Sequence, residues 1–326
     1  MSAEISQAKF IVNLTDPSFR GIYRGKRKHE DDIIDILERS RNAGVKSMII
    51  TGGSLHESEV ALKLAKECGL YATVGCHPTR STEFDSFEGG PDAYYDALDK
   101  LIEASLSGTG RVVAVGECGL DYDRTHFAEP SVQRVYFRRQ LSLAKKHHLP
   151  LFLHSRSAHG DFIRILREEG FGANGGTAVG GAGGVVHSFT GTIQEAKDYM
   201  EMGFCVGVNG CSLKTEENVA AVKSIHLDKI MLETDAPWCS MTTTHASKKH
   251  LDGLPAGLKH IYLLQATQPE RFVRGKSVKG RNEPCTIGGV AWVVFKAMGL
   301  PSFVDFTQNA WDNTVQVFNL HELEEK

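Results

Sequence analysis

The sequence lacks the features that would place it in several common functional classes. None of its seven cysteines forms a Cys-x-x-Cys pair. No apolar run approaches the length needed to span a bilayer, and residues 1–9 are too short and polar for a secretory signal. There is no Walker A motif, no Gly-x-Ser-x-Gly elbow and no Gly-x-Gly-x-x-Gly run after a strand. These absences predict reduced thiols in a cytoplasmic or nuclear protein without membrane contact.

Positive charge is also not in excess, because the formal net charge is −3 and the isoelectric point is about 6.5. A protein without an overall positive field is expected to hold phosphate at a confined site rather than on a broad basic face. Two local basic clusters are either phosphate-binding or simply solvated loops. They are Arg20, Arg24, Lys26, Arg27 and Lys28, and Arg271, Arg274, Lys276, Lys279 and Arg281.

Eight short apolar runs recur along the chain, separated by segments with helical patterns. The runs are continuous rather than alternating, which is typical of strands buried on both faces of a parallel sheet. Their starts lie roughly 20–40 residues apart, as in consecutive βα units, and eight such units close a TIM barrel. The sequence therefore predicts an α/β fold, a single (β/α)8 barrel domain over residues 1–326. The predicted strands are Phe10–Leu14, Ser47–Thr51, Tyr71–Cys76, Val112–Gly116, Leu149–Leu153, Gly184–Val186, Phe204–Val208 and Ile230–Leu232.

Two segments depart from this regular alternation. Residues 170–184 contain eight glycines in fifteen positions, which predicts a flexible surface insertion on the N-terminal side of the barrel. Residues 240–281 form a long polar connection after the last strand, so we expect them to build one wall of a substrate cleft. Elsewhere, Ser54 and Thr192 each precede a glutamate by three residues, which predicts capping boxes at two helix starts.

Metal-binding residue types follow the ends of four predicted strands. They are Glu117, His154, His187 and Asp235. In a parallel barrel these strand ends meet at one face, and adjacent strands lie about 4.8 Å apart, so both imidazoles can reach one ion. Each residue alone has a structural alternative: a loop-capping acid, or a histidine hydrogen-bonded in the core. Together they predict one or two divalent cations at the C-terminal face of the barrel.

Four further residues near these strand ends are candidates for the site, and three of them have two possible roles. Glu233 either orients a metal ligand or forms a buried ion pair. His77 contacts substrate phosphate or lies behind a ligand, with a purely structural role as the alternative. Asn13 is a weaker ligand at the end of the first strand. Trp238 either stacks on a base or packs beneath the loop.

Mixed oxygen and nitrogen ligands in an open site suit hydrolysis, since divalent ions polarise the scissile group and activate water. Carboxylates acting on phosphate favour Mg²⁺ or Mn²⁺, whereas imidazoles also admit Zn²⁺. A cysteine nucleophile at Cys118 is a weaker competitor.

These positions and their surroundings resemble the TatD family of metal-dependent deoxyribonucleases, in particular the eukaryotic TatD DNase domain-containing proteins. The resemblance extends over about residues 9–320 and is carried by blocks that are specific together. The main blocks are Val74-Gly75-Cys76-His77-Pro78, Gly116-Glu117-Cys118-Gly119-Leu120-Asp121, Phe152-Leu153-His154, Val186-His187-Ser188-Phe189, Asn209-Gly210-Cys211-Ser212 and Leu232-Glu233-Thr234-Asp235-Ala236-Pro237-Trp238.

The resemblance implies a TIM-barrel metallohydrolase of the amidohydrolase superfamily that cleaves phosphodiester bonds in DNA. It implies 3′–5′ exonuclease or endonuclease activity, or both, with a role in DNA repair or DNA fragmentation. By position, it assigns the metal to Glu117, His154, His187 and Asp235. Many family members carry His-x-His at the end of the first strand, where this chain has Asn13-Leu14-Thr15. Tight binding of a second ion therefore depends on the substrate phosphate.

The resulting hypothesis is a nuclease, most simply Mg²⁺-dependent, that acts on single-stranded DNA ends. Asp235 helps to deprotonate the attacking water, while Arg24 and Arg80 steady the phosphate. The same ligands would serve a hydrolase of small amides, esters or phosphorylated metabolites. A binding protein with a vestigial site is the second alternative.

Overall fold

The computed structural model of the protein describes residues 8–321, and its centre is an eight-stranded parallel sheet. The strand order is β1-β4-β5-β6-β7-β8-β9-β10, so each strand lies beside the next one along the barrel. The eight predicted strands are confirmed, with ends that shift by a few residues. They are β1 (Ala8–Val12), β4 (Val45–Ile50), β5 (Tyr71–Val74), β6 (Val112–Asp121), β7 (Leu151–Arg156), β8 (Gly184–Val186), β9 (Cys205–Val208) and β10 (Ile230–Leu232).

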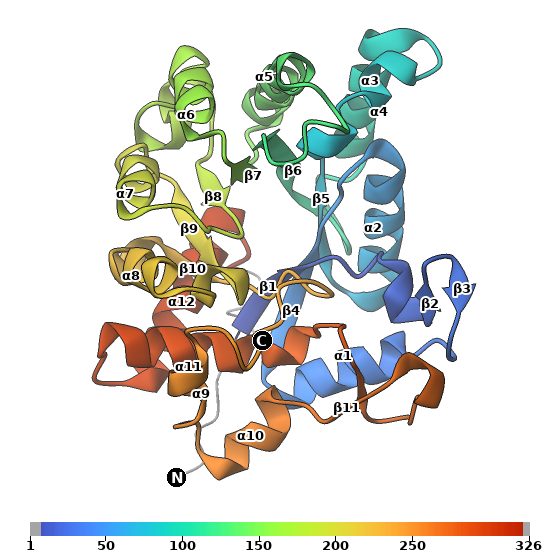
Figure 1. Ribbon diagram of the computed structural model, residues 1–326. Coiled ribbons are helices and arrows are strands. Elements are labelled where there is room, and N and C mark those ends of the chain that lie inside the picture. The colour runs from blue at the N-terminus through green and yellow to red at the C-terminus, as the bar shows by residue number, and fades with distance from the viewer. Residues whose placement is uncertain (1–7, 322–326) are drawn as a thin grey trace.

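The first and last strands of this order meet and close the sheet. Just beyond β1, the backbone N–H of Asn13 donates to the carbonyl oxygen of Ala236, just beyond β10, at 2.9 Å. Figure 1 shows the helices as a ring around the strands. The fold is therefore the predicted α/β barrel of TIM type.

Several of the surrounding helices bury one apolar stripe, whereas α11 is buried on all sides along most of its length. In α6, for example, Phe162, Ile165 and Leu166 are buried at the i, i+3, i+4 spacing of one helix face. The helices are α1 (Ile33–Asn42), α2 (Leu55–Cys68), α3 (Glu83–Ser86), α4 (Gly90–Glu103), α5 (Pro130–His147), α6 (His159–Glu168), α7 (Ile193–Glu201), α8 (Glu216–Lys223), α9 (Lys248–Leu251), α10 (Ala256–Tyr262), α11 (Ile287–Met298) and α12 (Phe303–Phe318).

Side-chain caps begin two of these helices at the predicted positions. The Thr192 hydroxyl accepts from the Glu195 N–H while the Glu195 carboxylate accepts from the Thr192 N–H, a complete capping box. At α2, the Ser54 hydroxyl accepts from the Glu57 N–H at 3.2 Å. These caps fix the points at which the loops of the C-terminal face end and the outer helices α2 and α7 begin.

The interior of the barrel is filled by residues from seven of the strands and is closed off by the end of α12. This cluster includes Ile49, Tyr71, Val113, Phe152, Val185, Cys205, Met231 and Phe318. The neighbouring strand residues face outward and join the larger cluster beneath the helices. The Phe152 ring lies 4.4 Å from the ring of His187, so the packed interior supports the floor of the C-terminal face.

The glycine-rich segment 170–184 has several exposed residues, as a surface insertion would, but it is packed against the barrel rather than loose. Gly175 and Gly176 are buried, and the Gly175 N–H donates to the Met202 carbonyl at 2.8 Å. A Cβ atom at Gly203 would lie 2.5 Å from the Gly175 nitrogen. The glycines therefore permit backbones to approach closely, and Phe171 is fully buried beside them.

The connection 240–281 extends from the last strand to the loop before α1. It contains α9, α10 and the short strands β11 (Ala266–Thr267) and β12 (Ser277–Val278). In Figure 1 this part of the chain, drawn in orange, lies beside α1. Arg281 binds both carboxylate oxygens of Asp32 at 2.6 and 2.8 Å, and all of these side chains are buried. The segment thus forms one side of the C-terminal face. Arg281 links it to Asp32 at the start of α1.

No single helix among residues 8–321 is long and apolar enough to cross a bilayer. One consecutive pair, Pro284–Met298 and Phe303–Phe318, would meet that length and composition only together, and it is bent by 113°.

Replacement of Arg281 by alanine should strongly destabilise the fold. The change leaves Asp32 and Glu283 buried with only Arg39 to balance two negative charges. Loss of one partner from a buried network costs about 3–5 kcal/mol, which urea denaturation would measure. The matched control is Arg274→Ala, because Arg274 anchors the same segment through exposed pairs with Glu30 and Asp35. Its cost should stay below about 1 kcal/mol, and equal costs for both variants would contradict this interpretation.

Candidate metal centre

Three of the four predicted ligands meet at one point at the C-terminal face of the barrel. Oε1 of Glu117, in β6, lies 2.8 Å from Nδ1 of His154 and 2.7 Å from Nε2 of His187. His154 belongs to β7, and His187 directly follows β8. The two nitrogens are 3.3 Å apart, and all three residues are buried. Adjacent strands have thus brought one carboxylate oxygen and two imidazole nitrogens together, as the order of the strands predicts.

This donor set fits a divalent cation. Two imidazole nitrogens that bind one ion at about 2.0–2.1 Å in tetrahedral geometry lie about 3.3 Å apart, as they do here. Oxygen and nitrogen donors of this kind suit Mn²⁺, Zn²⁺ and related ions. Glu117, His154 and His187 would hold the ion.

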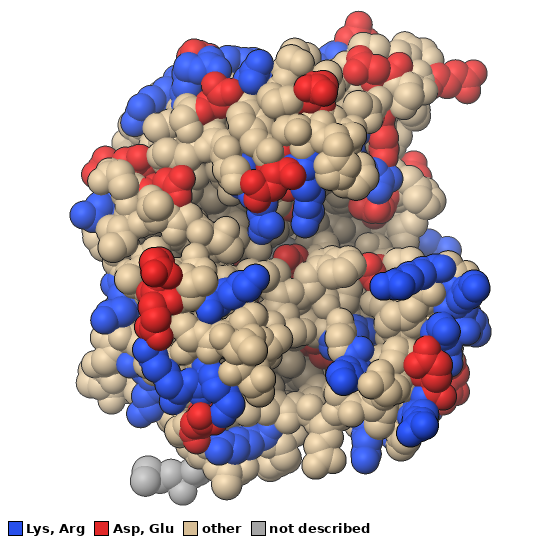
Figure 2. Space-filling view, viewed as in Figure 1, with Lys and Arg blue, Asp and Glu red and all other residues tan. Residues whose placement is uncertain are grey.

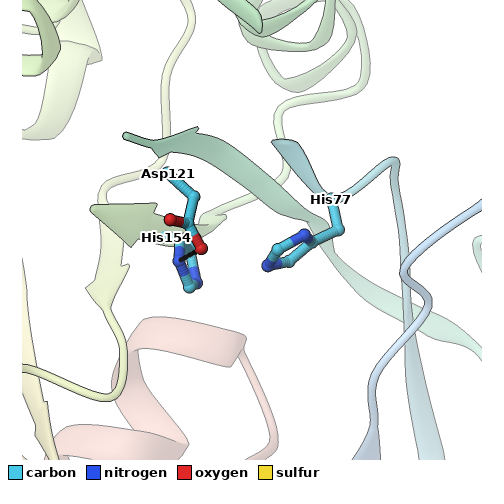
Figure 3. Close-up of side chains that lie close together, drawn as sticks. All are labelled: His77, Asp121 and His154. Carbon is cyan, nitrogen blue, oxygen red and sulfur yellow. Dashed lines mark ion pairs between the residues drawn. The ribbon is translucent and has the colours of Figure 1, made fainter. Parts of the chain in front are cut away.

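A buried carboxylate lies behind each of the two histidines. Nε2 of His154 is 3.3 Å from Oδ2 of Asp121, and Nδ1 of His187 is 3.8 Å from Oε2 of Glu233. None of these four atoms has a hydrogen-bond partner among the described residues, although Oδ2 of Asp121 also lies 3.8 Å from Nε of Arg124. Figure 3 shows Asp121 directed toward the His154 ring. A carboxylate behind each imidazole places the proton on the far nitrogen and turns the near nitrogen toward a metal.

Glu233 is held in this position by the neighbouring strand ends. Its Oε1 accepts hydrogen bonds from the backbone N–H of Ser188 and from Nδ2 of Asn209, the latter at 3.2 Å. No lysine or arginine pairs with Glu233 in the described part of the chain. Of the two roles considered for Glu233, the geometry therefore favours the residue that orients His187.

The charges of this cluster shift the pKa values of its members strongly. Burial alone would raise the pKa of Glu117, but the neighbouring His187, His77 and His154 hold it well below its usual range. Burial would likewise lower the pKa of His187, but Glu117 and Glu233 raise it well above its ordinary value. Three carboxylates thus face two imidazoles, and the surplus of negative charge favours a bound cation.

His77, which follows β5, lies on the other side of Glu117. Nδ1 of His77 accepts from the Thr79 N–H at 3.1 Å, so its proton is on Nε2, 3.3 Å from Oε1 of Glu117. Burial lowers the pKa of His77, although Glu117 opposes this shift. The His77 ring is edge-on to that of His154, with centroids 4.6 Å apart (Figure 3). His77 therefore presents an N–H donor beside the metal ligands.

Asp235, the fourth predicted ligand, lies outside the group of three but next to it. One of its carboxylate oxygens accepts from Nδ2 of Asn13 at 2.9 Å, and the other accepts from the Cys239 thiol at 3.4 Å. Burial raises the pKa of Asp235 to about 6, an effect that His187 opposes and the charges of Glu233 and Glu117 reinforce. The structure thus places Asn13 as a partner of Asp235 at the seam between β1 and β10.

The remaining predicted contacts lie farther from the ligands or are already paired. Trp238 is 58% exposed, so it does not pack beneath the loop and its ring is open to a ligand. Arg24 is exposed on the loop between β2 (Ile22–Tyr23) and β3 (Lys26–Arg27). Arg80 forms ion pairs with Glu57 and Glu83, which offset the positive charge that was expected to steady phosphate.

A cavity of about 860 Å³ lies among the loops that follow β7, β8 and β9; its lining is adjacent along the chain to His154 and His187 but includes none of the candidate ligands. Ser155 and Arg156, which follow His154, line one side, and Lys214 lines another. Figure 2 shows a hollow on this side of the molecule, bordered by both basic and acidic side chains rather than by a broad basic surface. The molecule therefore provides an open hollow of mixed polar and apolar lining on the loops that follow the ligand-bearing strands.

Sequence reasoning missed Asp121, Asn209 and Arg156. Asp121 follows Glu117 by four residues, and this even spacing places two side chains on the same face of a strand. That signal could have found it, but the predicted strand stopped at Gly116, whereas β6 continues to Asp121. Cys118, the alternative nucleophile, is fully buried, and burial raises the pKa of its thiol.

Comparisons with known proteins agree with this geometry. A family profile described as TatD related DNase matches residues 13–319. Deoxyribonuclease Tat-D of Schizosaccharomyces pombe is 43% identical over 94% of this chain and 94% of that protein. The 3′-5′ ssDNA/RNA exonuclease TatD of a Rahnella species is 34% identical over 77% of this chain and 86% of that protein.

Solved structures give the same result. A crystal structure of an uncharacterized amidohydrolase from Saccharomyces cerevisiae superposes with a TM-score of 0.85 and 31% identity, covering 96% of this chain and 99% of that chain. A hydrolase TatD family protein from Entamoeba histolytica superposes with a TM-score of 0.84 and 31% identity, covering 96% and 98%. The barrel and its closure are thus shared along nearly the whole length of these proteins.

Removal of the charge behind either histidine should weaken metal binding. We expect Asp121→Asn and Glu233→Gln each to lower Mn²⁺ affinity by about 10–100-fold, because the imidazoles lose basicity and a fixed orientation. Isothermal titration calorimetry would measure this directly. Asp161→Asn is the matched control, since Asp161 pairs with arginines on α5 and α6 and should leave the affinity unchanged. Wild-type affinity in both test variants would refute the assignment of Asp121 and Glu233.

Proposed function

The chain belongs to the TatD-related DNase family, and we propose that it is a divalent-metal-dependent nuclease that hydrolyses phosphodiester bonds in single-stranded DNA. The observation that carries the proposal is the single Glu117 oxygen shared by His154 and His187, with a buried carboxylate behind each imidazole. Such a set would hold an ion that polarises a phosphate and makes water more acidic. We propose Mg²⁺ or Mn²⁺ as the ion for this reaction, with Zn²⁺ as the alternative.

The residues around the ligands would supply the proton transfers. With a pKa of about 6, Asp235 is mostly ionised at neutral pH and can accept a proton from the attacking water. Asn13 and the Cys239 thiol fix its two oxygens in place. His77 stays neutral and offers its Nε2–H, which would donate to a phosphate oxygen bound beside Glu117.

The cavity beside the ligands gives a place for the nucleic-acid strand. Arg156 is half-buried and Lys214 is exposed, and the described part of the chain forms no ion pair with either side chain. Both cations are therefore free to bind phosphates adjacent to the one that is cleaved. The exposed Trp238 offers a face for base stacking near the same opening.

Two of the three acidic residues that line the cavity, Asp123 and Glu195, do not offset these two cations directly; the third is Glu217. Asp123 accepts from the Ser157 hydroxyl at 2.6 Å, and Glu195 is engaged in the cap of α7. Each carboxylate is thus committed to its own loop. The arrangement supports a strand held by a few local contacts, in keeping with the net charge of −3.

The state of the cysteines bears on the compartment in which the protein works. All seven cysteines are free, which supports a reducing compartment, either cytoplasm or nucleus. A role in DNA repair or DNA fragmentation would follow from the activity.

The decisive experiment compares substrates under controlled metal conditions. Purified protein would be incubated with 5′-labelled and 3′-labelled single-stranded oligonucleotides, a duplex and an RNA, each with Mg²⁺, Mn²⁺, Zn²⁺ or EDTA. A panel of small esters, amides and phosphorylated metabolites would be run in parallel. Metal-dependent cleavage of the single strand supports the proposal, and the two labels report the direction of digestion. Turnover of a small substrate with intact oligonucleotides under every metal would favour the rival hydrolase.

Replacement of Glu117 by alanine should reduce nuclease activity to the level seen with EDTA. The variant loses the one carboxylate that both ligand histidines share, so Mn²⁺ binding should be lost with it. Glu201→Ala, on the exposed face at the end of α7, is the control for the same chemical change. Circular dichroism would establish that both variants are folded. Cleavage by Glu117→Ala at the wild-type rate would exclude Glu117 as a ligand.

Replacement of Arg156 or Lys214 by alanine should weaken substrate binding without slowing chemistry. Removal of an interaction made equally in the bound and transition states raises KM and leaves kcat nearly unchanged. The slope of log KM against log salt should also fall by about 0.7 for each phosphate that the variant no longer binds. Arg41→Ala, an exposed change on α1, is the control. An unchanged salt slope in both variants would exclude the cavity as the path of the strand.

A further inference from the structure

The two basic clusters of the sequence lie together in the folded chain. Residues 20–28 contain five cations and no acid, and residues 271–281 also contain five cations and no acid. The ring of Phe272 stacks on the ring of His29, with centroids 4.4 Å apart. In Figure 2, basic side chains gather over β2, β3 and the neighbouring segment at the right of the view, with a few acidic side chains among them. Two clusters that are distant in sequence therefore form one surface.

Acidic residues neutralise only part of this surface. Three exposed acids pair with cations of the two clusters: Glu30, Asp31 and Glu270. Six exposed cations have no ion pair among residues 8–321, and we call them the basic patch: Arg24, Lys26, Arg27, Arg271, Lys276 and Lys279. Like charges on one surface repel one another, and a bound polyanion would relieve that repulsion.

The hairpin formed by β2 and β3 holds Arg24 at a tight turn. Tyr23 pairs with Lys26, so the loop has two residues, and both have a positive φ, 51° for Arg24 and 73° for Gly25. This is the geometry of a type I′ turn, whose first central position is normally taken by Asn, Asp or Gly. An arginine gains nothing from that backbone, which points to a role for its charge.

The second segment is closed by its own backbone. β11 pairs with β12, and the Lys279 N–H donates to the Thr267 carbonyl at 2.8 Å. Within the loop, the Lys276 N–H donates to the Val273 carbonyl at 3.0 Å. Ordered backbone thus carries the cations of both segments, so an anion that binds them does not first have to order the loops.

Both segments are joined to the loop that carries Asp235. Nη1 of Arg281 donates to the Ser18 carbonyl at 3.1 Å, just before the first cluster. The next residue, Asn282, donates its backbone N–H to the Pro237 carbonyl at 2.9 Å. The basic patch therefore borders the face at which the proposed cleavage takes place.

We propose that the basic patch binds backbone phosphates of the uncleaved part of a nucleic-acid strand whose end lies at the metal centre. The inference rests on the proposed nuclease function and adds an outer contact region to the cavity lined by Arg156 and Lys214. Contacts to phosphates position a strand without reading its sequence. The patch thus favours long strands over short ones, whatever their sequence.

The test removes charge from the patch and compares it with the same loss elsewhere. The patch variant carries three substitutions at exposed lysines without ion pairs: Lys26→Gln, Lys276→Gln and Lys279→Gln. The control variant carries three at exposed lysines on the outer helices α2, α4 and α8: Lys63→Gln, Lys100→Gln and Lys223→Gln. Both sets lower the net charge from −3 to −6, so a difference between them reports position rather than total charge. Circular dichroism would establish that both variants are folded.

Fluorescence anisotropy in EDTA measures strand binding without cleavage. At about 0.1 M salt, the patch variant should bind a long labelled single strand about 10–100-fold more weakly than wild type, and the control should match wild type. The slope of log Kd against log salt should fall by about 2, from about 0.7 for each of three lost phosphate contacts. Equal affinity of wild type and patch variant, or an equal loss in the control, would overturn the proposal. Loss of binding to phosphatidylserine vesicles with unchanged strand affinity would assign the patch to a membrane and overturn it as well.

Cleavage tests the connection between the patch and the metal centre. With Mn²⁺, the patch variant should show a higher KM for long strands and an unchanged kcat, and both constants should be unchanged for a tetranucleotide. An equal rise in KM for the tetranucleotide would place these lysines at the reaction site and overturn the outer contact. If wild type cleaves no oligonucleotide with any metal, the proposed function fails, and anisotropy still decides whether the patch binds nucleic acid.

Discussion

The buried carboxylate of Glu117 is the constraint on which the rest of this site depends. Removing a carboxylate from water is costly unless opposite charge and hydrogen bonds replace the water. Here two imidazoles take the place of water around Glu117, and a further buried carboxylate lies behind each imidazole. The result is a row of alternating acids and imidazoles across the strand ends: Glu233, His187, Glu117, His154 and Asp121. Three acids and two imidazoles leave negative charge that a bound cation would offset, so a metal would add to the stability of the barrel's C-terminal face.

Much of the barrel and of this row could be predicted from the sequence, because both follow from local pattern. Strands buried on both faces must be continuous apolar runs, so a polar residue at the end of such a run is conspicuous. Glu117, His154 and His187 all appear in this way. Asp121 does not, because the continuous apolar run ends at Gly116 and only the even spacing from Glu117 indicates that the strand goes on. The extension is held by backbone pairing with β7, where Asp121 also meets His154, and these partners come from a different strand.

The glycine-rich segment shows the opposite error. Composition treats glycine as a source of freedom, and eight glycines in fifteen residues then predict a loose insertion. In the folded chain, Gly175 and Gly203 instead allow two backbones to approach more closely than any side chain would permit. The partner lies in the turn after α7, so no local rule can reveal it. Composition alone therefore cannot identify a position where a neighbour distant in sequence requires glycine.

The two halves of the site are built in different ways, and this difference separates metal binding from substrate handling. Glu117 and His154 lie on β-strands, and His187 directly follows one, where backbone pairing and the packed interior fix their positions. Asp235 and Cys239 lie instead in a loop, and both have left-handed backbones. That loop is held by the Asn13 side chain and by backbone hydrogen bonds from Asn13 and Asn282 rather than by strand pairing. A change in the loop can therefore alter proton transfer or strand binding while the strand-borne ligands stay in place.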